Sequence, residues 1–156
     1  MIYTFVLPFQ LMPKPRGKKG KYGNIYHNDE AYLTYKRQVE TIIIRSVPKG
    51  SQWKYPIGVA LLSEFLAKNR GSEPDLIDNC IGSVLDALVA KDYIKDDSQR
   101  YLRDCLIRGV ESDCHFNQFW IFDSGDYPIV LDRMMRVYNE VNDRLTVASF
   151  KRKYFL

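Results

Sequence analysis

Acidic residues that could bind a metal ion flank one helix-like stretch in the middle of the chain. Asp75 and Asp78 stand at its start, and Asp97 follows its end, next to Asp96. A helix of about 13 residues spans about 20 Å, and six or seven extended residues after it recover about the same distance. Asp97 can therefore return to the side of Asp75 and Asp78. Three carboxylates held together would supply the hard oxygen ligands that Mg²⁺ prefers.

The same acids also have a purely structural interpretation. Asp75 followed three residues later by Asp78 resembles a capping box, and acidic residues favour helix N-termini in general. Asp96-Asp97 before a strand is an ordinary turn sequence. Taken alone, these residues leave both interpretations open.

A basic loop precedes this acidic region. Five cations occur over eight residues with no acid among them, at Lys14, Arg16, Lys18, Lys19 and Lys21. Tyr22 and Tyr26 follow and could stack on unpaired bases. A solvated loop is the alternative, but beside a carboxylate cluster the pattern favours binding of nucleic-acid phosphates.

The net charge of +4 conceals an uneven distribution. Residues 1–45 hold eight Lys/Arg and three Asp/Glu, whereas residues 73–113 hold five Lys/Arg and ten Asp/Glu. The first segment therefore carries +5 and the second −5. A metal-dependent enzyme acting on a polyanion needs both kinds of surface, although segregated charge on a solvated surface explains the same numbers.

Periodicity and turn residues predict the elements that must position these groups. Strands are expected at residues 2–7, 57–66, 100–108 and 115–122. Helices are expected at residues 29–45, from Asp75 to about Ala90, and at 128–145, with a loop at 13–28. These elements predict one α+β domain over residues 1–156, a small mixed β-sheet with packed helices. Residues 123–156 are expected to form a C-terminal helical extension.

Length and composition exclude several classes of protein. The 156 residues suit one domain, and 46% hydrophobic residues indicate a globular chain. No apolar run reaches the roughly 18 residues of a membrane span, and the opening residues lack the basic start of a signal peptide. Three cysteines without a CxxC pair favour a reduced, cytoplasmic setting. His27 and His115 are too few and too scattered for a histidine metal site.

The stretch PDLIDNCIGSVLDALVAKDYIKDDSQ at residues 74–99 resembles the signature of the RusA family of Holliday-junction resolvases. That signature reads approximately P-D-x-D-N, a helix ending L-D-A-L, and then Y-x-D-D-x-Q. The opening strand, basic loop and following helix are similar too, so the likeness covers residues 2 to about 110. The resemblance implies a homodimeric endonuclease that cuts four-way DNA junctions with Mg²⁺, for which Mn²⁺ could substitute. It assigns catalytic, metal-binding roles to Asp75, Asp78 and Asp97.

The spacing from Asp78 to Asp97, 19 residues, agrees with the family, but the chain departs from the pattern twice. Two residues, Leu76 and Ile77, separate the first two aspartates where the family has one. The family also carries a lysine four residues after the second aspartate, where this chain has Gly82. Candidate replacements for that basic group are Lys68, Arg70, Lys91 and Lys95.

These observations together predict a Mg²⁺-dependent endodeoxyribonuclease acting on Holliday junctions or other branched DNA in recombination and repair. Two alternatives stay open. The departures at Gly82 and before Asp78 suit a catalytically weakened or inactive junction-binding protein of the same fold. A metal nuclease acting on flaps or RNA would need the same charges and carboxylates.

Overall fold

The computed structural model describes residues 1–12, 18–19, 25–26, 30–66, 81–95, 98, 100–112 and 114–155. Its helices are α1 (Glu30–Ser46), α2 (Ile81–Ala90) and α3 (Tyr127–Phe155), the last preceded by a 3₁₀ turn at Ser124–Asp126. The strands of the main sheet are β1 (Ile2–Leu7), β4 (Ile57–Leu66), β5 (Leu102–Ser112) and β6 (Phe116–Asp123). Two further strands, β2 (Lys18–Lys19) and β3 (Ile25–Tyr26), pair with each other.

The main sheet has four strands in the order β1-β6-β4-β5. Strand β6 is antiparallel to both β1 and β4, whereas β4 and β5 are parallel. Strands β1, β4 and β5 therefore all run in one direction. Parallel neighbours need a crossover connection, and α2 lies between β4 and β5 in sequence. The expected α+β fold with a small mixed sheet is confirmed.

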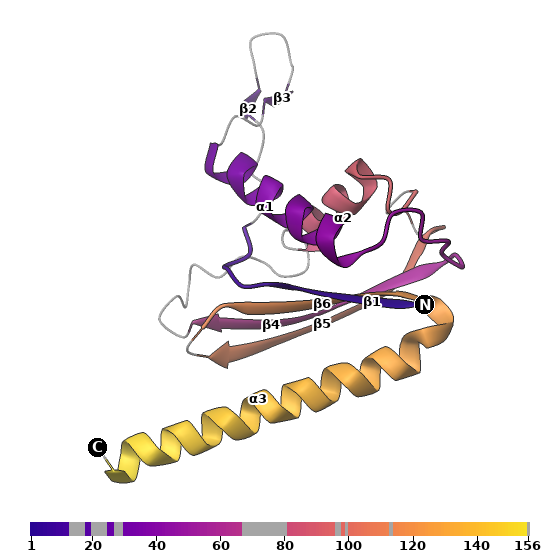
Figure 1. Ribbon diagram of the computed structural model, residues 1–156. Helices are drawn as coiled ribbons and strands as arrows, with labels where there is room; N and C mark the ends of the chain where they lie inside the picture. Colours follow the sequence, from indigo (N-terminus) through magenta and orange to yellow (C-terminus); the bar gives the residue numbers. More distant parts are fainter. Residues whose placement is uncertain are drawn as a thin grey trace.

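Helices cover both faces of the sheet. Because side chains alternate along a strand, the central strand β4 contributes to a core on each face. Ile57, Val59 and Leu61 of β4 belong to a core shared with α1 and α2. Ala60 and Leu62 belong to a second core shared with α3. Figure 1 shows the corresponding layers, with α1 and α2 over one face and α3 along the other. The central strand is therefore buried on both sides.

The largest differences from the sequence-based expectation concern three regions. Helix α3 continues to Phe155 and not to about 145, because no Gly or Pro interrupts the chain after Val130. Strand β5 runs on to Ser112 because β4 pairs with it along its whole length. The expected loop at 13–28 contains the short pair β2–β3. The predicted strands at 2–7 and 57–66 are confirmed with the same bounds.

The start of the chain and the segment before β4 are joined at Asp123, the last residue of β6. The Asp123 carboxylate accepts hydrogen bonds from the Lys54 backbone N–H and from the Met1 amino group, each at 2.8 Å. The Met1 amino group also donates to Asp126. Hydrogen bonding to Asp123, and then to Asp126, raises the pKa of the Met1 amine above its usual value. This arrangement holds Lys54 and the start of the chain at the end of β6.

Within the described ranges, no helix combines the length and the apolar composition that crossing a membrane requires.

Substitution of glycine by alanine should have opposite effects on stability at Gly58 and at Gly82. A Cβ atom on Gly58 would collide with the Phe122 ring, whereas a Cβ atom on Gly82 would meet none of the described residues within 4 Å. Gly58→Ala should lower the free energy of unfolding by about 1–3 kcal/mol through overpacking. Gly82→Ala should raise it by up to about 1 kcal/mol, because alanine is the better helix former. Urea denaturation of both variants measures the two effects, and a neutral Gly58→Ala would contradict the close approach of Phe122.

Candidate active site

One edge of the sheet carries the attachment points of both segments that the sequence analysis singled out. Because β1, β4 and β5 run in the same direction, their carboxyl ends share this edge (Figure 1). After β1 the chain continues toward the basic loop, and after β4 it continues toward Asp75 and Asp78. The basic and acidic segments therefore begin at the same side of the domain.

Asn117 of β6 forms hydrogen bonds with the ends of β1 and β4 at this edge. It faces Leu7 of β1 on one side and Ser63 of β4 on the other. Its amide nitrogen donates to the backbone carbonyls of Leu7 and Phe9, at 3.2 and 2.7 Å. Its amide oxygen accepts from the Ser63 hydroxyl at 2.6 Å. Since Asn117 is 1% exposed, these bonds satisfy a buried amide and hold the starts of both segments in register.

Glu64 is a buried carboxylate at the same edge, on the opposite face of the sheet. It is 3% exposed and accepts from the Ser112 hydroxyl at 2.9 Å and from Arg144 of α3 at 2.5 Å. The Cys114 thiol lies 3.6 Å away. The sequence analysis missed Glu64, although a serine and a glutamate inside the otherwise apolar β4 were a visible signal. The ion pair attaches α3 to the end of β4.

Helices α1 and α2 meet through polar side chains as well as through their core. The Tyr35 hydroxyl lies 3.1 Å from the Ser83 hydroxyl, and both side chains are buried. Burial first, and then the nearby negative charge of Asp86, raise the pKa of Tyr32 above its usual value. Asp86 is half-buried. The face of α2 that carries Asp86 therefore turns toward α1.

Gly82 precedes Asp86 by four residues and so lies on nearly the same side of α2. Gly82 is half-buried, and within the described ranges nothing lies within 4 Å of a Cβ atom built on it. Close packing against the part of the chain that the structure describes therefore does not explain the glycine here.

The residues on both sides of Asp96-Asp97 are held in place. The Lys95 backbone N–H donates to the Tyr55 hydroxyl at 3.2 Å. The Ser98 carbonyl accepts from the backbone N–H groups of Tyr101 and Leu102, each at 2.9 Å. The chain thus enters and leaves the acidic pair from defined positions beside the start of β4.

The predicted site residues themselves lie mostly outside the described residues. This holds for the acids Asp75, Asp78 and Asp97, and for the cations Lys14, Arg16 and Lys21. Lys18 and Lys19 form β2, where they face Tyr26 and Ile25 of β3. The convergence of the three carboxylates stays a prediction. Among the residues that the structure does describe, no group of three or more His, Cys, Asp or Glu could hold a metal ion.

The candidate replacements for the family's lysine differ in their surroundings. Lys91 forms an ion pair with Glu40 of α1 at 3.0 Å. Lys95 is exposed, and its ammonium group lies 5.8 Å from the centroid of the Tyr55 ring. Lys95 forms no ion pair with any residue that the structure describes. Lys68 and Arg70 lie outside the described residues.

Comparison with known families agrees with the sequence resemblance. A family model described as endodeoxyribonuclease RusA matches residues 8–114. The match begins directly after β1 and ends before β6, so it includes both the basic and the acidic segment. Helix α3 lies beyond it. No curated protein matches the chain.

Asn117→Ala should destabilise the domain by about 2–4 kcal/mol, because it leaves the Ser63 hydroxyl and two backbone carbonyls buried without this partner. Gln118→Ala serves as the matched control. Gln118 is the half-buried neighbour on the same strand, and its truncation should change stability by no more than about 0.5 kcal/mol. Chemical denaturation compares the two, and equal stabilities would remove Asn117 from its anchoring role.

Proposed function

The chain belongs to the RusA family of endodeoxyribonucleases, and we propose that it is a Mg²⁺-dependent enzyme that cuts four-way DNA junctions as a homodimer. One observation carries this proposal. The family match over residues 8–114 contains the basic loop and all three predicted catalytic acids. The common sheet edge from which both segments depart supports it.

The proposed metal site consists of Asp75, Asp78 and Asp97. Their carboxylate oxygens are the donors that suit Mg²⁺, with Mn²⁺ as a substitute. When bound, such a cation lowers the pKa of a coordinated water and offsets negative charge during phosphodiester hydrolysis. In the sequence, Asp75 and Asp78 precede α2 and Asp97 follows it. The buried side chains of α2 belong to the core that it shares with the sheet.

Binding of DNA is assigned to the basic loop. Lys14, Arg16, Lys18, Lys19 and Lys21 would contact phosphates and so position the backbone without reading bases. A four-way junction has two-fold symmetry, and a C₂ dimer offers two matched sites for paired cuts. The free thiols Cys105 and Cys114 suit a reducing compartment such as the cytoplasm.

A catalytically weakened junction-binding protein is the second candidate, and Gly82 favours it. The resemblance gives the family a lysine at this position, and none of the described residues packs closely enough against Gly82 to explain its loss. The two candidates agree on DNA binding and differ only in cleavage.

Asp78→Asn and Asp97→Asn should each abolish Mg²⁺-dependent cleavage and leave junction binding intact or tighter. Each substitution removes a metal ligand and a negative charge near phosphate. The measurement is cleavage of labelled four-way junction, flap, duplex and RNA substrates, with and without Mg²⁺, together with binding in Ca²⁺. Asp132→Asn on the exposed side of α3 removes the same charge far from the site and serves as the control.

Near-normal cleavage by either variant would remove that residue from the site. Binding without cleavage by the unmodified protein would favour the second candidate, and preference for flaps or RNA would change the assigned substrate.

Gly82→Lys should raise the single-turnover rate of junction cleavage. The introduced lysine would project one helical turn after Asp78, from where it could stabilise charge on the phosphate under attack. Gly82→Ala improves the helix without adding charge, so it separates the two effects. Asp86, one turn further on, is the competing partner for the new ammonium group. A folded Gly82→Lys protein that cuts no faster than Gly82→Ala would mean that another group already fills this role.

A further inference from the structure

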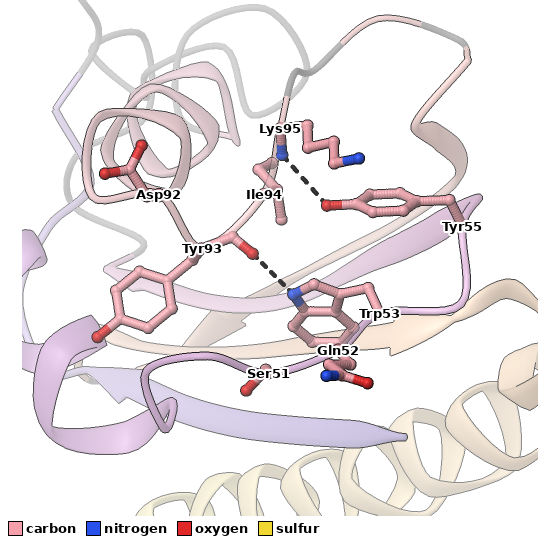
Figure 2. Close-up of a pocket in the computed structure, with 8 residues that line it drawn as sticks. All are labelled: Ser51, Gln52, Trp53, Tyr55, Asp92, Tyr93, Ile94 and Lys95. Carbon is pink, nitrogen blue, oxygen red and sulfur yellow. Dashed lines mark hydrogen bonds between the residues drawn. The ribbon is translucent and has the colours of Figure 1, made fainter.

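A pocket of about 600 Å³ lies between the segment before β4 and the segment after α2. Figure 2 shows the two segments facing each other across it. Its lining consists of two short runs of residues: Ser51, Gln52, Trp53 and Tyr55 from the first segment, and Asp92, Tyr93, Ile94 and Lys95 from the second. This volume is within the range of small-molecule sites, roughly 300–1,000 Å³.

The walls of this pocket are held in place before any ligand binds. The Trp53 indole N–H donates to the Tyr93 carbonyl at 2.7 Å, and the Lys95 N–H donates to the Tyr55 hydroxyl (Figure 2). Ser51 donates to the Pro48 carbonyl at 2.7 Å. These bonds join the two segments to each other and to the turn before them. Ligand binding therefore requires little further ordering of the pocket walls.

Asp92 lies at the edge of the pocket because of the backbone geometry at the C-terminus of α2. Its φ of 59° places it in the left-handed region, and the Tyr93 N–H then donates back to the Leu88 carbonyl at 2.9 Å. This is the usual geometry of a helix C-terminus. An aspartate at such a position keeps its carboxylate outside the helix, where it can accept hydrogen bonds.

The pocket combines an apolar interior with a polar rim. Trp53, Tyr93 and Ile94 are buried, whereas Gln52, Asp92 and Lys95 are exposed. The rim therefore offers a side-chain amide, a carboxylate and an ammonium group that has no ion-pair partner among the described residues. A ligand that matches this rim needs an anionic group for Lys95 and N–H donors for Asp92 and Gln52, on a flat body of modest size.

A nucleotide has these three properties. Its phosphate matches Lys95, its base edge carries N–H donors, and its planar ring suits an apolar interior. Lys95 is two residues before Asp97 in the sequence, so a nucleotide whose phosphate is bound by Lys95 would lie near this one of the three proposed catalytic acids. A base inside a duplex cannot enter a protein pocket unless it leaves its stack, which costs least where pairing is already interrupted.

We propose that this pocket binds one unpaired nucleotide of the DNA strand at the junction crossover, with Lys95 on its phosphate and with Asp92 and Gln52 on its base edge. The inference rests on the proposed function and deepens it. It also gives Lys95 a task distinct from metal binding, namely to position the strand beside the acids.

The test uses four-way junctions with 2-aminopurine at single positions around the crossover, bound in Ca²⁺ so that no cleavage occurs. Unstacking of the labelled base into the pocket should raise its fluorescence. Lys95→Ala should weaken junction binding about tenfold, as expected for loss of one charge-assisted contact, and should suppress the fluorescence rise in the remaining complex. Gln52→Ala combined with Asp92→Asn should suppress the rise with a smaller effect on affinity, because neither side chain contacts phosphate.

Lys49→Ala is the matched control. Lys49 is an exposed lysine in the turn before the pocket and does not line it, so its removal should leave the fluorescence rise unchanged. All four altered side chains are exposed, and thermal melting verifies that the variants fold.

The outcomes separate this proposal from the proposed function. If the protein cuts junctions but no labelled position becomes brighter, or if Lys95→Ala behaves like Lys49→Ala, the pocket does not take a nucleotide while the nuclease assignment stands. If the protein neither binds nor cuts junctions, the proposed function fails and the DNA ligand of the pocket fails with it.

Discussion

The buried amide of Asn117 is the constraint on which the arrangement of the site depends. A side-chain amide without contact with water must find partners for its donors and its acceptor. Here those partners come from the end of β1 and from the end of β4. Any shift of either strand would leave polar atoms unpaired, so the register that satisfies Asn117 also fixes where the basic and acidic segments begin.

Burial of β4 on both faces explains why this register is well defined. A one-residue slip would exchange the residues that face α1 and α2 with those that face α3. Gly58 adds a steric limit, since the Phe122 ring occupies the space of its missing side chain. Helix α3, which lies beyond the family match, takes part through the ion pair of Arg144 with Glu64. The C-terminal helix is thus integrated into the core of this domain.

The two ends of the sheet carry different structural features. The carboxyl ends of β1, β4 and β5 carry polar clusters, and long connections follow β1 and β4. The opposite end, before β4 and after α2, carries a preformed pocket whose last lining residue is Lys95. Helix α2 links the two ends, because the acidic segment leads into it and Lys95 follows it.

The sequence by itself determined the mixed α+β fold, the bounds of β1 and β4, and the family, because periodicity and the 74–99 signature are local properties. It also pointed to Asp75, Asp78 and Asp97, whose convergence stays a prediction. Only the tertiary structure revealed the Asn117 anchor, the Glu64–Arg144 pair and the pocket at Trp53 and Lys95. Each of these joins residues 40 or more positions apart, and spacing along a chain does not encode which distant polar groups satisfy one another once water is excluded.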